Sequence, residues 1–229
     1  MKILIAEDDL NIRLGLKDLL EVEGYNCLEA ADGDQAWALF ERHRPDLVLL
    51  DIMMPGQDGY SLCRRIRQQD QQLPVIFISA KSEEIDQVLG LELGADDYIK
   101  KPFGSREVVA RIRAVTRRCL ARGLSPTRVD DSFQMGDLRV LPAQLRAERD
   151  GHRIDLSLRD MRILQLLHRN PGRVLSRDEL FDECWGRHYL PSSRTLDQHI
   201  SKLRKAVELD AKDPRIIVTV HGVGYRFDG

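Results

Sequence analysis

The first half of the chain alternates short apolar runs with stretches of helical periodicity, and this alternation restricts the fold more than any other feature. Apolar runs occupy residues 3–6, 47–50 and 75–78, with weaker ones at 27–30 and 98–99. Between them, apolar residues recur at steps of three and four, as in Ile12, Leu16, Leu19 and Leu20. Strands that alternate with helices form right-handed βαβ units and a parallel sheet covered on both faces. We therefore predict an α/β fold with a doubly wound, five-stranded parallel sheet.

A length of 229 residues suits two domains, because a domain usually has about 100–200 residues. Residues 121–128 contain Gly, Ser and Pro without apolar periodicity, which is typical of a linker. Residues 1–122 carry 17 basic and 21 acidic side chains, a net charge of −4, whereas the remaining 18 basic and 16 acidic side chains give +2. We predict one domain over residues 1–120, a linker over 121–131 and a second domain over 132–229.

The cysteines and the apolar segments exclude several classes of protein. Cys27, Cys63, Cys119 and Cys184 are scattered without a C-x-x-C pair, so the sequence predicts neither a zinc site nor a disulfide framework. A membrane helix needs about 18 consecutive apolar residues, and the chain has no such run. We expect a cytoplasmic protein that is neither inserted into a membrane nor exported.

Polar side chains follow the predicted strands at the point where each run ends. They are Glu7, Asp8 and Asp9 after the first run, Asp51 and Ser79 after the runs at 47–50 and 75–78, and Lys100 and Lys101 after the last. In an open parallel sheet the carboxyl ends of all strands lie along one edge, and ligands bind there. We therefore expect these side chains to meet in one crevice.

The carboxylates of Glu7, Asp8 and Asp51 would repel one another in that crevice. Two unit charges about 4 Å apart repel by roughly 4 kcal/mol at an effective dielectric constant near 20, so the cluster needs a cation or a proton. Carboxylate oxygens without a nearby His or Cys favour Mg²⁺. Because a carboxylate can act as a nucleophile, we predict phosphoryl transfer onto Asp51. The metal and Lys101 would neutralise the phosphoryl oxygens, and Ser79 would hydrogen-bond the product.

These residues lie in longer motifs, which are residues 3–9 (ILIAEDD), 51–56 (DIMMPG), 79–80 (SA) and 94–103 (GADDYIKKPF). In this order and spacing they resemble the receiver domain of two-component response regulators, over roughly residues 1–120. The resemblance implies a flavodoxin-like sheet of order 2-1-3-4-5 and a phosphoryl group that reaches Asp51 from a sensor histidine kinase. It also implies that Asp8, Asp51 and the Met53 carbonyl bind Mg²⁺, that Glu7 assists through water, and that Lys101 contacts the phosphoryl group. We interpret Asp9 as a loop or helix-start acid rather than a ligand.

The same resemblance implies a conformational switch, in which Ser79 moves toward the phosphoryl group and Tyr98 turns inward. An ordinary half-buried strand aromatic stays an alternative interpretation of Tyr98. The charged face through which relatives dimerise corresponds to Gln87, Glu92, Asp97, Glu107, Arg111 and Arg113. A merely solvated helix face is the alternative, since exposed ion pairs contribute only about 0–1 kcal/mol each. Gln87 stands where a basic partner of Glu107 is usual, which leaves the strength of dimerisation open.

The second half shows hairpin and helix signals. Asp150-Gly151 predicts a hairpin turn, and Ser157 with Asp160 and Ser176 with Glu179 each resemble a capping box. A third helix is predicted from about residue 193 to 209. Its apolar stripe is Leu196, Ile200, Leu203 and Val207, opposite Arg194, Gln198, Ser201, Lys202 and Lys205. On one flank Asp197 and Arg204 could pair. Residues 216–227 read as a hairpin with His221 at its tip.

Helices followed by a hairpin suggest an α+β winged helix-turn-helix domain, although a helix with an ordinary polar face is equally compatible with the charge pattern. Residues 193–205 and 219–227 are similar to the output domain of the OmpR/PhoB subfamily of response regulators. The implied DNA-contacting residues are Arg194, Thr195, Gln198, Ser201, Lys202, Arg204, Lys205 and His221. His221 replaces a common arginine, so we expect wing binding to strengthen below about pH 6.5.

Together these features predict a transcription regulator whose phosphorylation at Asp51 promotes homodimerisation and binding to tandem half-sites in duplex DNA. RNA polymerase is a further partner that this interpretation leaves open. An alternative is a magnesium-dependent hydrolase that forms an aspartyl phosphate, but Asp51 is followed by Ile52-Met53 with no second acid two residues on. Another alternative is an output domain that binds RNA or protein.

Overall fold

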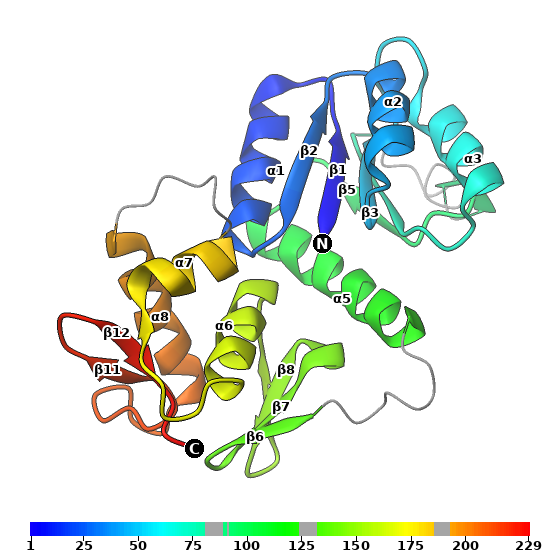
Figure 1. Cartoon of the computed structure of the whole chain (residues 1–229). Helices are drawn as coiled ribbons and strands as arrows, with labels where there is room; N and C mark the ends of the chain where they lie inside the picture. Colours follow the sequence, from blue (N-terminus) through cyan, green and yellow to red (C-terminus); the bar gives the residue numbers. More distant parts are fainter. Residues whose placement is uncertain (81–88, 91, 124–131, 186–192) are drawn as a thin grey trace. The chain divides into compact units, whose positions relative to one another are not determined.

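The structure is a computed structural model of the whole chain, and it describes all residues except 81–88, 91, 124–131 and 186–192 (Figure 1). The chain divides into two compact units, Met1–Cys119 and Leu120–Gly229, and each is described by itself. Among the described residues, no helix has both the length and the apolar character that crossing a bilayer requires.

The first unit is built on a five-stranded sheet of order β2-β1-β3-β4-β5, which confirms the predicted order. The strands are β1 (Lys2–Ala6), β2 (Asn26–Ala30), β3 (Leu47–Asp51), β4 (Val75–Ser79) and β5 (Asp97–Lys100). All neighbouring pairs are parallel, and β1 pairs with both β2 and β3. The residues that follow β1 therefore lie beside the end of β3, at the point where the strand order reverses.

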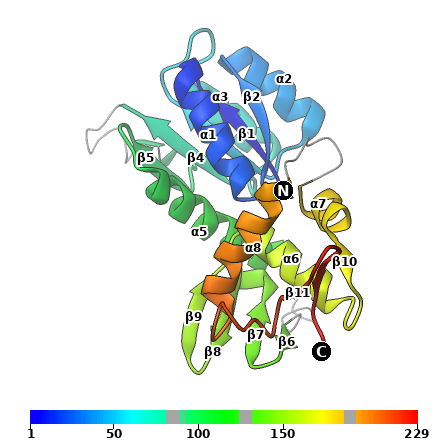
Figure 2. The ribbon, with the colours of Figure 1, turned by 90° about the vertical axis from the view of Figure 1, so that its left-hand side faces the viewer.

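Helices cover both faces of this sheet (Figures 1 and 2). They are α1 (Leu10–Val22), α2 (Gly33–His43), α3 (Gly59–Gln69) and α5 (Ser105–Gly123). On the face that α2 and α3 cover, Phe40 and Ile66 join Leu50 and Phe77 in one core. The strands are buried on both sides because their neighbours shield every residue of β3 and β4.

Aspartates fix where three of these helices begin. The side chain of Asp9 accepts hydrogen bonds from the backbone N–H groups of Asn11 and Ile12 at the start of α1. Asp32 and Asp58 cap α2 and α3 in the same way. Because an N-cap carboxylate satisfies donors that have no partner inside the helix, Asp9 is a helix-start acid, the second of the two interpretations that its sequence position allowed.

The second unit begins with an antiparallel sheet of order β6-β7-β8-β9. Its strands are β6 (Phe133–Met135), β7 (Leu138–Leu141), β8 (Arg146–Arg149) and β9 (His152–Asp155). The predicted hairpin turn at Asp150-Gly151 is confirmed, because it joins β8 to β9 and both residues have positive φ, 49° and 76°. A short 3-10 helix, Pro142–Gln144, connects β7 to β8.

Helices α6 (Leu158–His168), α7 (Arg177–Trp185) and α8 (Ser193–Val207) follow, with a second sheet of order β10-β12-β11. The strands are β10 (Leu175–Ser176), β11 (Val218–Val220) and β12 (Gly224–Arg226). Ser157 and Asp160 form the predicted capping box of α6. At α7 only half of a box forms, because Ser176 accepts from the Glu179 backbone while the Glu179 carboxylate pairs with Arg173.

Two predicted boundaries differ from the structure. Helix α5 continues to Gly123, so the first three residues of the predicted linker are helical, and 124–131 lie outside the described residues. Helix α8 ends at Val207, two residues before the expected end. There the carboxylate of Glu208 accepts hydrogen bonds from the backbone N–H groups of Arg215, Ile216 and Ile217, which folds the following loop back against the helix end.

Candidate functional site: an acidic cluster and an amphipathic helix

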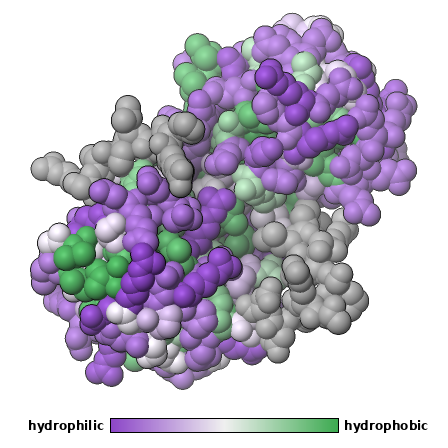
Figure 3. Space-filling model, viewed as in Figure 1, coloured by the Kyte–Doolittle hydropathy of each residue, from purple (hydrophilic) through white to green (hydrophobic). Residues whose placement is uncertain are grey.

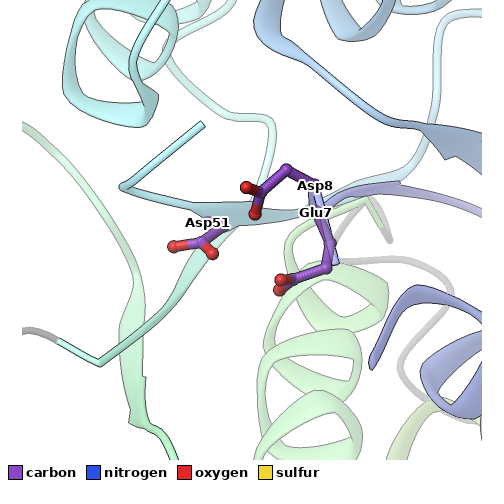
Figure 4. Close-up of side chains that lie close together, drawn as sticks. All are labelled: Glu7, Asp8 and Asp51. Atoms are coloured by element: carbon purple, nitrogen blue, oxygen red, sulfur yellow. The ribbon is translucent and has the colours of Figure 1, made fainter. Parts of the chain in front are cut away.

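Three carboxylates meet at the carboxyl edge of the parallel sheet. Glu7 and Asp8 follow β1, Asp51 ends β3, and one oxygen of each carboxylate lies within 4.8 Å of the other two. The close-up shows these side chains converging on one small space (Figure 4). Asp51 is 4% exposed and Glu7 is 1% exposed, whereas Asp8 is exposed. Glu7 and Asp51 therefore form the buried part of the site, and Asp8 forms the part that faces solvent.

Lys101 closes this cluster from the end of β5. Its Nζ lies 2.7 Å from Oε1 of Glu7 and 2.6 Å from Oδ2 of Asp51. Burial alone lowers the pKa of Lys101, but the hydrogen bonds to Asp51 and Glu7 outweigh burial and raise it. The ammonium group is therefore charged and offsets part of the negative charge at the site. Ser79, at the end of β4, is fully buried beside this group of strand ends.

Glu7 is the carboxylate whose ionisation the buried arrangement opposes. Burial raises its pKa to about 7, and the bond to Lys101 lowers it only in part. Its second oxygen, Oε2, is buried without a hydrogen-bond partner among the described residues. A buried carboxylate oxygen without a partner is costly, and a cation between the three carboxylates would satisfy it. The donor set is all oxygen, which fits Mg²⁺.

The chain on either side of the acids is held in place by close packing. A Cβ on Gly59 would lie 2.2 Å from the carbonyl oxygen of Asp51, so only glycine fits there. The backbone N–H of Met53 donates to Oδ1 of Asp51 at 3.0 Å, and the Met53 side chain is 60% exposed. These contacts leave Oδ2 of Asp51 to Lys101 and fix the direction of the carboxylate.

The sequence did not predict the role of Arg13, which holds the backbone of Glu7 and Asp8 by hydrogen bonds. Its Nη1 donates to the carbonyl oxygens of Glu7 and Asp8, at 2.5 Å and 3.2 Å. Arg13 also lies 3.9 Å from the carboxylate of Glu29 on β2. Its spacing of five and six residues from these acids carries no general signal, because the contact depends on how α1 leaves the turn.

In the second unit, α8 presents the amphipathic pattern expected from its sequence. Leu196, Ile200, Leu203 and Val207 are each at most 2% exposed. Gln198, Ser201, Lys202 and Lys205 are exposed on the opposite side. Figure 3 shows that hydrophilic side chains cover most of the visible surface of each unit. Thr195 is half-buried, and Arg194 lies in the first turn of α8, with its side chain outside the described residues.

Comparison with known proteins assigns both units. Residues 3–113 match the response regulator receiver domain, and residues 151–227 match the C-terminal domain of transcriptional regulatory proteins. Sensory transduction protein RegX3 of Mycobacterium tuberculosis is 42% identical over 234 residues, which cover 99% of each chain. The chain belongs to the OmpR/PhoB-type two-component response regulators.

Two further relatives extend this assignment. The alkaline phosphatase synthesis transcriptional regulatory protein PhoP of Bacillus subtilis is 39% identical over 231 residues, covering 99% of this chain and 96% of that protein. A CheY-like response regulator receiver domain protein from Methanospirillum hungatei is 30% identical, with a TM-score of 0.51, and covers 53% of this chain and 98% of its own. The response regulator described here is thus a transcription regulator that combines a receiver and a DNA-binding domain.

In the response regulator's receiver, the structure locates the two expected switch residues inside the protein. Tyr98 is 8% exposed and packs against Phe77, with ring centroids 6.3 Å apart. It is therefore more deeply buried than the half-buried strand aromatic that the sequence allowed. Ser79 and Tyr98 lie on adjacent strands, with Phe77 paired to Tyr98 and Ser79 paired to Lys100.

The charged residues expected on the receiver's dimer face divide into two groups. Arg111 lies 3.0 Å from Asp97 and 3.0 Å from Glu107, so these three form one cluster between β5 and α5. Glu92 is exposed, and Gln87 lies outside the described residues. Arg113 differs, because it pairs with Glu23, just after α1, at 2.5 Å. Arg111 and Arg113 are two residues apart on α5, a spacing that turns them to different sides of a helix.

The ion pair between Asp197 and Arg204 that the sequence allowed on α8 of this regulator does not form. Instead, Oδ1 of Asp197 accepts hydrogen bonds from Arg177 and from the Tyr225 hydroxyl. Arg204 turns toward the β11 strand and donates to the Ile217 carbonyl and to Thr219. At this position the long side chain of Arg204 reaches the hairpin rather than its helical neighbour. His221 is exposed in the turn between β11 and β12, where the hairpin prediction put it.

Proposed function

We propose that Asp51 is the phosphoacceptor of this response regulator and that a phosphohistidine of a cognate sensor histidine kinase is the donor. In this reaction a new P–O bond forms to a carboxylate oxygen of Asp51 while the P–N bond to the histidine breaks. The observation that carries the proposal is the position of Lys101 Nζ, 2.6 Å from Asp51 and 2.7 Å from Glu7. A fixed ammonium group beside the nucleophile can neutralise negative charge as the phosphoryl group arrives.

Mg²⁺ is the cofactor that the acidic cluster suits. Asp8, Asp51 and the Met53 carbonyl would hold the ion, and Glu7 would contact it through water. When bound, Mg²⁺ supplies positive charge at the phosphoryl oxygens. The unsatisfied Oε2 of Glu7 supports this assignment, because that oxygen lies in the same cluster and has no protein partner among the described residues.

Ser79 would hydrogen-bond the phosphoryl group, and Tyr98 would report the change on the β5 and α5 side of the receiver. Asp97, Glu107 and Arg111 already form a charge cluster there, and Glu92 and Gln87 belong to the same proposed dimer face. Phosphorylation would shift the population toward a receiver that dimerises through this face. Arg113 is left out of the proposed face, because its partner Glu23 follows α1.

Dimerisation would place two DNA-binding domains on tandem half-sites, which raises their joint affinity through effective concentration. The exposed Gln198, Ser201, Lys202 and Lys205 of α8, together with Arg194 and Thr195 at its start, would face the major groove. His221 at the hairpin tip would approach the neighbouring minor groove. Regulation of transcription also implies a location with the bacterial DNA in the cytoplasm, and RNA polymerase as a further partner.

Sizing the protein with and without Mg²⁺ and beryllofluoride tests this function. Beryllofluoride mimics a phosphoryl group on a carboxylate, so the wild-type chain should become dimeric only when both reagents are present. The Asp51→Asn variant is the matched control and should stay monomeric under every condition. A dimer that forms equally well in the variant would contradict the proposed control by Asp51.

A further inference from the structure

Arg204 lies on the helix that faces DNA, yet its guanidinium group is directed into the protein. Nε donates to the carbonyl oxygen of Ile217 at 2.9 Å, and Nη2 donates to Oγ1 of Thr219 at 2.7 Å and also to the Ile217 carbonyl. Ile217 is fully buried and immediately precedes the hairpin strand β11. Burial lowers the pKa of Arg204 from its ordinary value, but a guanidinium remains charged in any case. The side chain thus bridges helix and hairpin.

Tyr225 gives this bridge a second connection. Two arginines lie over its ring, with Cζ of Arg204 and Cζ of Arg177 each 5.4 Å from the ring centroid. Its hydroxyl donates to Oδ1 of Asp197 at 2.7 Å. Thr219 is the cross-strand neighbour of Tyr225 in the hairpin. Burial, and then Asp197, raise the pKa of Tyr225 to about 12, so the hydroxyl keeps its proton and stays a donor.

The two α8 residues in this network are seven positions apart, which puts them on the same side of the helix, two turns from each other. Asp197 and Arg204 therefore form hydrogen bonds with the hairpin at two positions along the helix axis. Lys202 and Lys205 of the same helix are exposed, and at about 100° per residue both are turned away from the direction of Arg204. The arginine that bonds to the hairpin and the two exposed lysines thus leave α8 in different directions.

We propose that Arg204 is a positioning residue for DNA binding, which fixes the β11–β12 hairpin against α8 and does not itself neutralise a DNA phosphate. The proposal rests on the proposed recognition of duplex DNA by α8 and the hairpin tip. A fixed angle between helix and hairpin lets both reach adjacent grooves without losing further conformational freedom on binding. This role differs from the DNA contact that the family resemblance implies for Arg204.

The salt dependence of binding separates positioning from phosphate contact. Each phosphate that a protein neutralises contributes a slope of about −0.9 in log K against log salt. Full-length wild-type protein, Arg204→Met and Lys205→Met would be titrated, between about 50 and about 200 mM salt, against a duplex that the wild-type chain selects from a random pool. We expect Arg204→Met to weaken binding about tenfold with the wild-type slope. Lys205→Met is the control, and it should make the slope shallower by about one.

A charge-conserving variant supplies a second readout. Arg204→Lys keeps a positive charge but loses the planar group that reaches two oxygen acceptors at once. Positioning predicts that Arg204→Lys binds as weakly as Arg204→Met, whereas a phosphate contact predicts recovery. The proposal would be overturned if Arg204→Lys bound DNA like wild type. It would also be overturned if the slope of Arg204→Met became shallower by about one.

The acceptor side provides a further test, which begins with two variants that keep Arg204. Thr219→Val removes the hydroxyl that accepts from Arg204, and Thr219→Ser retains it. We expect Thr219→Val to weaken binding about fivefold without changing the salt slope, and Thr219→Ser to bind like wild type. Thr219→Val should also add nothing in the Arg204→Met background. Additive effects would show that the two groups act separately and would overturn the proposal. If the wild-type chain selects no duplex at all, the DNA-binding function itself fails.

Discussion

The acidic site of the receiver and helix α8 of the second unit use charge in opposite ways. At the receiver site Glu7, Asp51 and Lys101 are largely withdrawn from water, and one ammonium group lies 2.6–2.7 Å from two carboxylates. On α8 the side chains of Lys202 and Lys205 are exposed. Buried charges interact strongly and are weakly screened, whereas exposed charges are screened by salt. The first region should therefore respond to geometry and pH, and the second to ionic strength.

The largest expected effect is the loss of phosphorylation in Asp51→Asn. An amide cannot supply the carboxylate nucleophile, so labelling by acetyl phosphate in the presence of Mg²⁺ should disappear. Asp58→Asn is a suitable control, because Asp58 caps α3, where it accepts hydrogen bonds from the backbone and hydroxyl of Ser61, and asparagine is an equally good cap. Labelling that persists in Asp51→Asn would place the phosphoacceptor elsewhere.

The close packing beside Asp51 should make the stability of the fold sensitive to an added methyl group at residue 59. A Cβ at residue 59 would lie 2.2 Å from the Asp51 carbonyl, so Gly59→Ala should cost about 3 kcal/mol or more of unfolding free energy. A Cβ on Gly15 in α1 would meet no other atom within 4 Å, and Gly15→Ala should stabilise by roughly 0.5–1 kcal/mol. Urea unfolding of both variants measures the contrast. Equal effects would mean that the Asp51 turn can relax.

The pH dependence of stability should come from Glu7. Its pKa in the folded chain is about 7, against an ordinary value of 4.5. The folded state therefore holds a proton that the unfolded state has lost, and the stability linked to that proton is full below pH 4.5 and lost as pH rises through about 7. Urea midpoints in EDTA should fall across this interval in wild type and change little in Glu7→Gln. An unchanged wild-type midpoint would contradict the raised pKa.

The exposed face should show a smaller, sequence-dependent effect. Lys202→Met removes a cation from the solvent-facing side of α8, and we expect an altered base preference worth about 1–3 kcal/mol at the affected position. Lys212→Met is the control, because Lys212 is exposed in the loop after α8. Binding-site selection from a random duplex pool measures both variants. The same preference in Lys202→Met and wild type would move the reading face away from this residue.

The smallest effect concerns the two arginines of α5. Arg111→Ala should weaken the beryllofluoride-dependent dimer by about 0–1 kcal/mol, because Arg111 belongs to the cluster with Asp97 and Glu107. Arg113→Ala should leave the dimer unchanged, since Arg113 is committed to Glu23. Sedimentation across a concentration series compares them. A dimer weakened more by Arg113→Ala would reverse the assignment of the face.

The sequence predicts the parts of this molecule that backbone geometry dictates. Parallel strands must end at one edge, so the meeting of Glu7, Asp51 and Lys101 follows from where three apolar runs stop. Helical periodicity likewise predicts the buried stripe of α8. The same rules do not reach contacts made by long, flexible side chains. Arg204 bonds to Ile217, 13 residues away, and Arg113 bonds to Glu23, 90 residues away, because tertiary packing decides which partner such chains meet.

Strand β5 sets the spacing between two charged contacts of the receiver. Asp97, at its first residue, holds Arg111, and Lys101, one residue past its end, holds Asp51. Successive side chains of a strand point to opposite faces, so adding or deleting a single residue would rotate one of these groups away from its partner. A substitution within this segment would leave the spacing of the two contacts unchanged, whereas an insertion would break either the Asp97–Arg111 or the Lys101–Asp51 pair.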